Sequence, residues 1–267
     1  MAAPAVFLTF DVEEFDLPVE YHQAISMHEQ MEVGMNGLTA IIPLLNRSNI
    51  ECTLFTTANF AEHFPSTIKE LSNKHEIASH TFYHSSFCND DLLLSRQKLE
   101  EITGKNVVGL RMPRLKEVAV DDVKKAVYLY DSSINPTYIP GRYNKLSLPK
   151  KIYDEDGLIR VPTAVTPNFR IPLFWLMFKN APYSLYKYWA LQTLKRYDYL
   201  SLYFHPWEFT DISQYKLPSY IAKPFGKALL DKLYRLVEDL QKEGSKFVSI
   251  ENYLKNNNTS IFSSAHL

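Results

Sequence analysis

The sequence predicts an α/β fold in which parallel strands form a barrel. Short apolar or β-branched runs alternate with helical patterns along the chain, which favours strands joined by crossover helices. Polar residues that could carry chemistry follow several of these runs, at the strand ends where α/β barrels place their sites. The length of 267 residues allows one barrel-sized domain, so we expect a single domain over residues 1–267.

The elements follow from apolar runs of strand length and from apolar residues at helical spacing. Strands are expected at Val6–Phe10, Cys52–Thr56, Glu76–Ser79, Val107–Leu110, Tyr128–Asp131, Tyr199–Phe204 and Lys246–Ile250. Helices are expected at Gly37–Leu45, Ser66–Ser72, Asp91–Ile102, Asp121–Ala126 and Lys227–Lys242. The helix at Asp91–Ile102 is strongly periodic, and its acidic first turn suits a helix N-terminus.

The stretch Asn135–Pro182 is rich in proline, so we expect an irregular insertion of long loops or short edge strands there. Inside it, Pro172–Phe178 is unusually apolar. The simpler interpretation is a buried segment. The alternative is an exposed lip that touches lipid or an apolar substrate tail, and it leaves contact with a membrane open.

Charge and composition exclude several classes of partner. The net charge of −1 and the pI of about 6.7 give no electrostatic case for nucleic acid or an anionic membrane. With 8 glycines and no phosphate-cradling glycine loop, nucleotide chemistry is not expected. Two cysteines, Cys52 and Cys88, are too few for a disulfide framework, and the N-terminus lacks the pattern of a secretory signal. A reduced cytoplasmic setting is the simplest expectation.

Two histidines four positions apart, His80 and His84, follow the strand expected at Glu76–Ser79. A single histidine at a strand end is more often a hydrogen-bonded structural residue than a ligand. A pair with three residues between can aim both rings at one ion, because about one turn of chain separates them. This pair is the best metal candidate in the sequence.

An acidic cluster follows the first strand. In an extended chain Asp11 and Glu13 point to the same face, whereas Glu14 points to the opposite one. One carboxylate of the like-facing pair could bind a metal while the other takes a proton from water. A solvated strand end is the alternative for an acidic cluster at this position.

Two later segments place polar residues after strands. In the run Tyr203–Glu208, His205 could protonate a leaving amine because its pKa lies near neutral pH. Trp207 would shape a pocket wall, and Glu208 could orient His205 or bind substrate. The run Arg111–Arg114 follows another strand, and an arginine there could keep a carboxylate base ionised.

Taken in order, these segments resemble the polysaccharide deacetylase family (NodB-homology, carbohydrate esterase family 4). The resemblance runs from Thr9 to about Glu208, and its most specific piece is Ser79–His84. The run His205–Glu208 is similar to a branch of that family linked to exopolysaccharide synthesis. Asp131–Ser133 falls at the expected fourth motif but lacks its usual tryptophan. The resemblance implies a distorted (β/α) barrel with seven strands rather than eight.

The resemblance also implies roles. It makes His80 and His84 metal ligands, with Glu13 as the third, and Asp11 the catalytic base. The spacing of the acids departs from the usual adjacent aspartates, and a glutamate stands at the third ligand position. The implied cofactor is a divalent metal, Zn²⁺ first, although such sites also accept cobalt or nickel.

The remaining roles concern the base, the acid and the oxyanion. Arg111 would steady Asp11, and His205 would be the general acid. The backbone N–H of Arg114 would stabilise the oxyanion, while its side chain, where the family commonly has tyrosine, could instead meet an anionic substrate group.

We therefore expect a metal-dependent hydrolase that removes N-acetyl groups from a carbohydrate. One alternative is an amidohydrolase that acts on a small amide or ureide, with or without metal. Another is a non-catalytic glycan-binding barrel.

Overall fold

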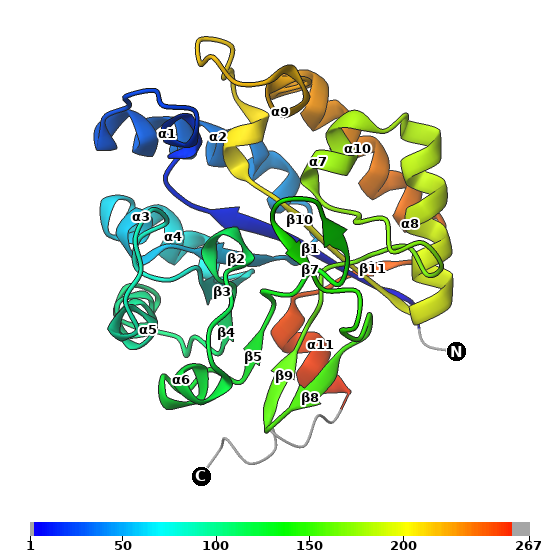
Figure 1. Cartoon of the computed structure of the whole chain (residues 1–267), viewed down its shortest axis with the longest axis horizontal. Helices are drawn as coiled ribbons and strands as arrows, with labels where there is room; N and C mark the ends of the chain where they lie inside the picture. The colour runs from blue at the N-terminus through cyan, green and yellow to red at the C-terminus, as the bar shows by residue number, and fades with distance from the viewer. Residues whose placement is uncertain (1–2, 258–267) are drawn as a thin grey trace.

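The computed structural model describes residues 3–257. Its centre is a curled sheet with the strand order β10-β1-β2-β3-β4-β5-β9-β8 (Figure 1). The strands of this row are β1 (Ala5–Val12), β2 (Thr53–Thr56), β3 (Glu76–Ser79), β4 (Gly109–Leu110), β5 (Tyr130–Asp131), β8 (Tyr153–Glu155), β9 (Leu158–Arg160) and β10 (Tyr199–Phe204). Within the described residues, the row without the antiparallel β8 holds seven parallel strands, as expected for the distorted barrel.

The barrel is nearly closed at the segment that follows β9. The Ala164 N–H donates to the Ser201 carbonyl of β10 at 2.8 Å, which joins the two ends of the parallel row. A further strand, β11 (Lys246–Phe247), pairs in parallel with the start of β1. Every residue of β1 is buried, because this strand has sheet neighbours and covering elements around it.

Helices lie outside the sheet. They are α1 (Leu17–Glu20), α2 (Met27–Leu45), α3 (Ala58–His63), α4 (Pro65–Ser72), α5 (Asp90–Thr103), α6 (Val120–Lys125), α7 (Trp175–Asn180), α8 (Tyr183–Tyr197), α9 (Ser219–Ala222), α10 (Gly226–Lys242) and α11 (Ile250–Asn256). Two 3₁₀ turns, η1 (Pro113–Leu115) and η2 (Pro206–Phe209), follow β4 and β10. Among the described residues, no helix is both long and apolar enough to cross a membrane.

The helix α2 approaches the rest of the fold more closely than a side chain would allow. A Cβ placed on Gly34 would lie 2.7 Å from the Glu13 carbonyl oxygen, and one placed on Gly37 would lie 2.1 Å from the Pro206 carbonyl oxygen. Glycine at these two positions therefore lets α2 lie directly against the backbone after β1 and after β10. The helix begins where the Ser26 side chain accepts the Glu29 N–H at 3.2 Å.

The predicted elements are present, with different bounds in places. The expected strand at Glu76–Ser79 has the same bounds, whereas the helix expected at Gly37–Leu45 starts ten residues earlier, at Met27. The strand expected at Lys246–Ile250 ends at Phe247, because Ser249 caps a new helix by accepting the Asn252 N–H. The helices α1, α3, α7, α8, α9 and α11 were not among the expected elements.

The stretch 135–182 contains more regular structure than loops and edge strands. β9 is an internal strand of the barrel, paired with β5 on one side and β8 on the other. A separate hairpin, β6 (Tyr138–Ile139) with β7 (Tyr143–Asn144), stands off the main sheet (Figure 1). The apolar run Pro172–Phe178 is buried at Leu173 and Phe178, as the simpler interpretation held, and half-buried between them.

Candidate metal centre and active site

The predicted site residues meet at one end of the barrel. Asp11 is the second-last residue of β1, and Glu13 follows the strand directly. His80 follows β3, and His205 follows β10. Because these strands are parallel, their C-terminal ends lie at the same rim. Chain segments up to about two hundred residues apart therefore contribute to one site.

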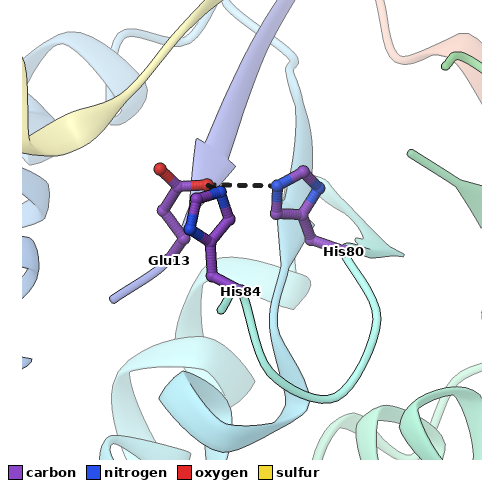
Figure 2. Close-up of side chains that lie close together, drawn as sticks. All are labelled: Glu13, His80 and His84. Atoms are coloured by element: carbon purple, nitrogen blue, oxygen red, sulfur yellow. Dashed lines mark ion pairs between the residues drawn. The ribbon is translucent and has the colours of Figure 1, made fainter. Parts of the chain in front are cut away.

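Glu13, His80 and His84 form a tight cluster (Figure 2). The Oε2 atom of Glu13 lies 3.1 Å from Nε2 of His80 and 3.1 Å from Nε2 of His84. The two rings are nearly parallel, with centroids 5.6 Å apart. All three side chains are at least nine-tenths buried, so water screens their interaction little.

Each cluster residue is oriented by a second group. Nδ1 of His80 lies 2.7 Å from the Arg111 carbonyl oxygen, which can only accept, so Nδ1 carries the proton and Nε2 keeps a lone pair. Nδ1 of His84 pairs in the same way with Oδ1 of Asp16 at 2.8 Å. The indole of Trp207 donates to Oε1 of Glu13 at 3.0 Å, which leaves Oε2 facing the histidines.

The donor set fits a divalent cation. Oε2 of Glu13 and Nε2 of His80 are buried without a hydrogen bond in the described structure, although they lie within ion-pair distance of each other. The three ligand atoms of the cluster lie within 4.8 Å of one another. Two imidazole nitrogens and a carboxylate oxygen are the protein ligands of many catalytic zinc sites. An ion bound by all three ligand atoms would explain why polar atoms of the cluster are buried without a hydrogen bond.

The electrostatics of the cluster favour a positive charge. Burial would lower the pKa of His84, but the charges of Glu13 and Asp16 and the hydrogen bond to Asp16 raise it to about 9. Burial would raise the pKa of Glu13, yet the neighbouring histidines hold it well below its ordinary value. A cation can replace the proton that these carboxylates otherwise attract.

Asp11 and Arg111 form a buried ion pair beside the cluster. Nη1 of Arg111 donates to Oδ1 of Asp11 at 2.7 Å and to the Thr9 hydroxyl at 2.8 Å. The other terminal nitrogen of Arg111 donates to the Ser132 hydroxyl, and its guanidinium lies over the Phe55 ring. Arg111 is fully buried, so its contact with Asp11 is held from several sides. The segment Asp131–Ser133, which lacks the tryptophan usual at this motif, therefore helps to hold Arg111 through Ser132.

The Arg114 side chain faces protein rather than the cavity interior. Its Nε donates to Glu20 at 2.6 Å, and its terminal nitrogens donate to Oδ2 of Asp16 and to the His84 carbonyl oxygen, each at 2.9 Å. These acceptors take three of the five N–H groups of the guanidinium, and contact of this side chain with an anionic substrate group stays a prediction. Its backbone has a φ of 54°, a left-handed conformation that is uncommon for arginine.

His205 approaches the cluster from β10. Its Nε2 lies 3.9 Å from Oδ2 of Asp11 and 4.0 Å from Oε1 of Glu13. Its ring stacks on Trp207 at 4.8 Å, and its Nδ1 lies 3.1 Å from Oε1 of Glu208. Burial lowers the pKa of His205, but the Glu13 charge and the hydrogen bond to Glu208 outweigh burial and raise it.

Two residues that the sequence did not single out complete these environments. Asp16 joins His84 to Arg114, and burial would raise its pKa, but the hydrogen bond to His84 and the charges of His84 and Arg114 lower it. Lys179 is fully buried, and its Nζ lies 3.6 Å from Oε2 of Glu208. The available signals were an extra aspartate after the first motif and a lone lysine at the end of an apolar run.

Comparison with known proteins agrees with this site. Residues 1–128 match the family model described as polysaccharide deacetylase. This match covers just under half of the chain, which is therefore similar to the family over its first half. Members of the polysaccharide deacetylase family are hydrolases that act on N-acetyl C–N bonds. The match ends after η1, so it includes Asp11, the metal cluster and Arg111, but not His205. No curated protein matches the sequence.

Solved structures share the fold of this chain. A Mycobacterium smegmatis protein assigned to the polysaccharide deacetylases has a TM-score of 0.61 at 19% identity, covering 96% of this chain and 93% of its own. A Pseudomonas aeruginosa PAO1 protein with the same assignment gives 0.63 at 14%, covering 98% and 91%. The allantoinase PuuE gives 0.60 at 16%, also covering 98% and 91%. At these identities the likeness shows the fold alone.

Proposed function

We propose that this protein hydrolyses the N-acetyl group of a sugar-containing substrate, with Glu13, His80 and His84 holding a divalent cation. The observation that carries the proposal is the convergence of a carboxylate and a histidine on the cluster: Nε2 of His205 lies 3.9 Å from Oδ2 of Asp11. Amide hydrolysis needs a base for the attacking water and an acid for the leaving amine, and these two groups can serve as that pair.

The cation we propose is Zn²⁺, because two imidazoles and one carboxylate are a common zinc ligand set. When bound, such an ion would polarise the acetyl carbonyl and lower the pKa of water toward neutrality. The His80 tautomer set by the Arg111 carbonyl and the carboxylate–histidine contact of Asp16 with His84 support this role, since each leaves Nε2 free to bind.

The protein's own residues would move the protons. Asp11, paired with Arg111, takes a proton from the water whose oxygen attacks the acetyl carbon. His205 gives a proton to the nitrogen as the C–N bond breaks, so acetate and a free amine leave. The backbone N–H of Arg114, which borders the same cavity, donates to the oxygen that becomes negative during attack.

The test is acetate release from single N-acetylated sugars and their oligomers, with Zn²⁺-loaded protein. We expect His80→Ala to lose both zinc and turnover, and Asp11→Asn to keep zinc and lose turnover. Lys227→Ala is the matched control, because Lys227 is an exposed residue in an ion pair far along the chain in α10. Full activity of both site variants would refute the mechanism.

A second candidate is hydrolysis of a small amide or ureide, favoured by the fold likeness to an allantoinase over 98% of this chain. The two candidates differ in their dependence on metal, because the intact Glu13–His80–His84 cluster has no role in a metal-independent reaction. Protein purified without chelator that contains no zinc, yet releases ammonia or amine from a ureide, would favour this candidate over the deacetylase.

We further propose that the deacetylase acts in the cytoplasm on a precursor of an exopolysaccharide or surface glycan. The charge balance and the two unpaired cysteines support this setting, and the His205–Glu208 run supports the branch. Cell fractionation tests the location, and protein found outside the cytoplasm would overturn it.

A further inference from the structure

The cavity above the cluster is small. Its volume is about 370 Å³, at the low end of the ~300–1,000 Å³ typical of small-molecule sites. Its inner end carries the charged groups Asp11, Glu13, His80, His84 and His205. A space of this size suits one sugar ring with its acetamido group and does not accommodate several consecutive residues of a polymer.

The mouth of the cavity is enclosed by four segments that contact one another. Glu20 of α1 pairs with Arg142 of the β6–β7 hairpin, with 3.8 Å between the charged atoms. Tyr21, after α1, and Tyr220 of α9 both line this cavity. The Asn180 side chain of α7 donates to the Tyr220 carbonyl oxygen at 2.8 Å. These links hold the rim together, so the enclosure results from specific contacts between segments.

One side of the enclosure separates the cavity from an open groove. A second hollow of about 900 Å³ lies beside the cavity and shares with it Asp16, Glu20, Arg114, Leu115, Arg142 and Tyr143. Glu20 stands between the two arginines, with Arg114 at 2.6 Å and Arg142 at 3.8 Å. A glycan chain that extended from the cavity into the groove would have to pass through this row of ion pairs.

The outer part of the cavity is apolar, unlike its charged floor. It is lined by Leu17, Ile139, Pro140, Leu176 and Ile221. The rings of Tyr21 and Tyr220 also line the cavity, whereas Trp175 lies at the inner end, with its ring 5.1 Å from that of His205. The part of the substrate next to the reacting sugar therefore lies against apolar surface, which favours an apolar or aryl group over a hydrated polysaccharide strand.

Resting on the proposed deacetylase function, we propose that this protein removes the acetyl group only from a terminal amino sugar and excludes residues inside a polymer. The favoured substrate is a single N-acetylated sugar, or a chain end, joined to an apolar group that lies at the mouth. The wall formed by Arg114, Glu20 and Arg142 is the specificity determinant.

The first experiment uses a pentamer of N-acetylglucosamine with its reducing end reduced, together with phenyl and methyl glycosides of N-acetylglucosamine, N-acetylgalactosamine and N-acetylmannosamine. We expect the acetate released early from the pentamer to come entirely from its terminal sugar, as mass spectrometry of the fragments would show. Turnover of the single-sugar glycosides alone also supports the proposal, and phenyl glycosides should have the lower KM.

Two results would overturn the inference in distinguishable ways. Acetate from internal residues of the pentamer contradicts end-specificity and leaves the deacetylase function standing. No acetate from the pentamer or from any glycoside, with zinc bound, contradicts the deacetylase function itself and the inference with it.

The second experiment removes the wall. Arg142→Ala, and Ile139→Ala combined with Arg142→Ala, should open the cavity toward the groove and allow loss of acetyl groups from internal residues. Lys227→Ala, which changes an exposed cation elsewhere, should keep the wild-type pattern. Circular dichroism and zinc content confirm that each variant folds. An unchanged cleavage pattern in both folded, zinc-loaded wall variants would rule out this wall as the determinant.

Discussion

The metal side and the acid side of this site hold their histidines in different surroundings. His80 and His84 are oriented by a backbone carbonyl and by Asp16, a carboxylate that continues to Arg114 and the protein surface. His205 is enclosed by tryptophan rings and by Glu208, whose partner Lys179 is fully buried. The metal side presents lone pairs, whereas the acid side retains a proton in a dry environment. The two sides can therefore be perturbed separately.

The largest effect is expected from His205→Gln, which should lower turnover and leave zinc binding unchanged. Loss of a general acid typically slows a reaction by about 10²–10⁴-fold. We expect a fall of that order in kcat, with zinc content equal to wild type, because His205 is not part of the Glu13–His80–His84 cluster. Steady-state kinetics and metal analysis of one preparation check both. Loss of zinc in this variant would show that the two sides are not separate.

Lys179→Met tests the buried half of the acid side. Its Nζ has no hydrogen bond in the described structure and sits 3.6 Å from Glu208, so removing it leaves a buried carboxylate without its cation. Breaking a buried pair in this way costs about 3–5 kcal/mol. Denaturant unfolding measures the loss.

Lys227→Met is the control for that measurement, because its pair with Asp231 is exposed and worth about 0–1 kcal/mol. Equal stability of the two variants would mean that the Lys179–Glu208 pair is neutral in the folded protein.

Asp16→Asn tests the metal side without touching a ligand. Loss of a carboxylate that orients a metal-binding histidine typically weakens metal affinity by about 10–100-fold. We expect that range in a chelator competition with Zn²⁺, and little change in the environment of His205. The Glu20→Gln variant is the comparison, because Glu20 touches Arg114 but not His84. Wild-type zinc affinity in the Asp16→Asn variant would show that Asp16 does not support metal binding.

The smallest effect concerns His75, at the other end of β3 from His80. It accepts the Cys52 N–H, and burial together with the charge of Lys74 lowers its pKa to about 4. The unfolded chain, with a pKa near 6.5, takes up the proton first, so stability falls as pH drops below about 6.5 and levels off below about 4. Between pH 7 and pH 5.5 we expect a loss of about 1 kcal/mol.

Unfolding curves of wild type and His75→Gln across this range measure that loss. The part of the slope owed to His75 should vanish in the variant. An unchanged slope of stability against pH would mean that His75 is not held neutral by burial. The folded protein would then carry a charged histidine at this position without a carboxylate partner.

The sequence was sufficient for the parts of the site that are local. His80 and His84 are four positions apart, and Asp11 and Glu13 share one strand face, so their spacing and strand ends predicted where they would meet. The orienting groups could not be found this way, because their partners are distant: Asp16 lies 68 positions from His84, and Trp207 lies 194 from Glu13. Only the closed barrel brings them together.

The strands of the barrel also divide into those that the sequence predicts and those that depend on distant pairing. The strand Tyr199–Phe204, a mostly apolar run, was predicted to the residue because burial on both faces favours such a run. β9 was hidden in the proline-rich stretch because its three residues belong to the barrel only through pairing with β5 and β8. The wall at Arg142 belongs to that same stretch.

The two glycines of α2 set the spacing between these halves. Gly34 lies against the Glu13 carbonyl and Gly37 against the Pro206 carbonyl, each closer than any side chain permits. The helix α2 contributes no charged group to the site, but its close contacts help to set the distance between the Glu13–His80–His84 cluster and His205. A methyl group at Gly37 would lie 2.1 Å from the Pro206 carbonyl oxygen, so either the helix or the segment after His205 would have to shift.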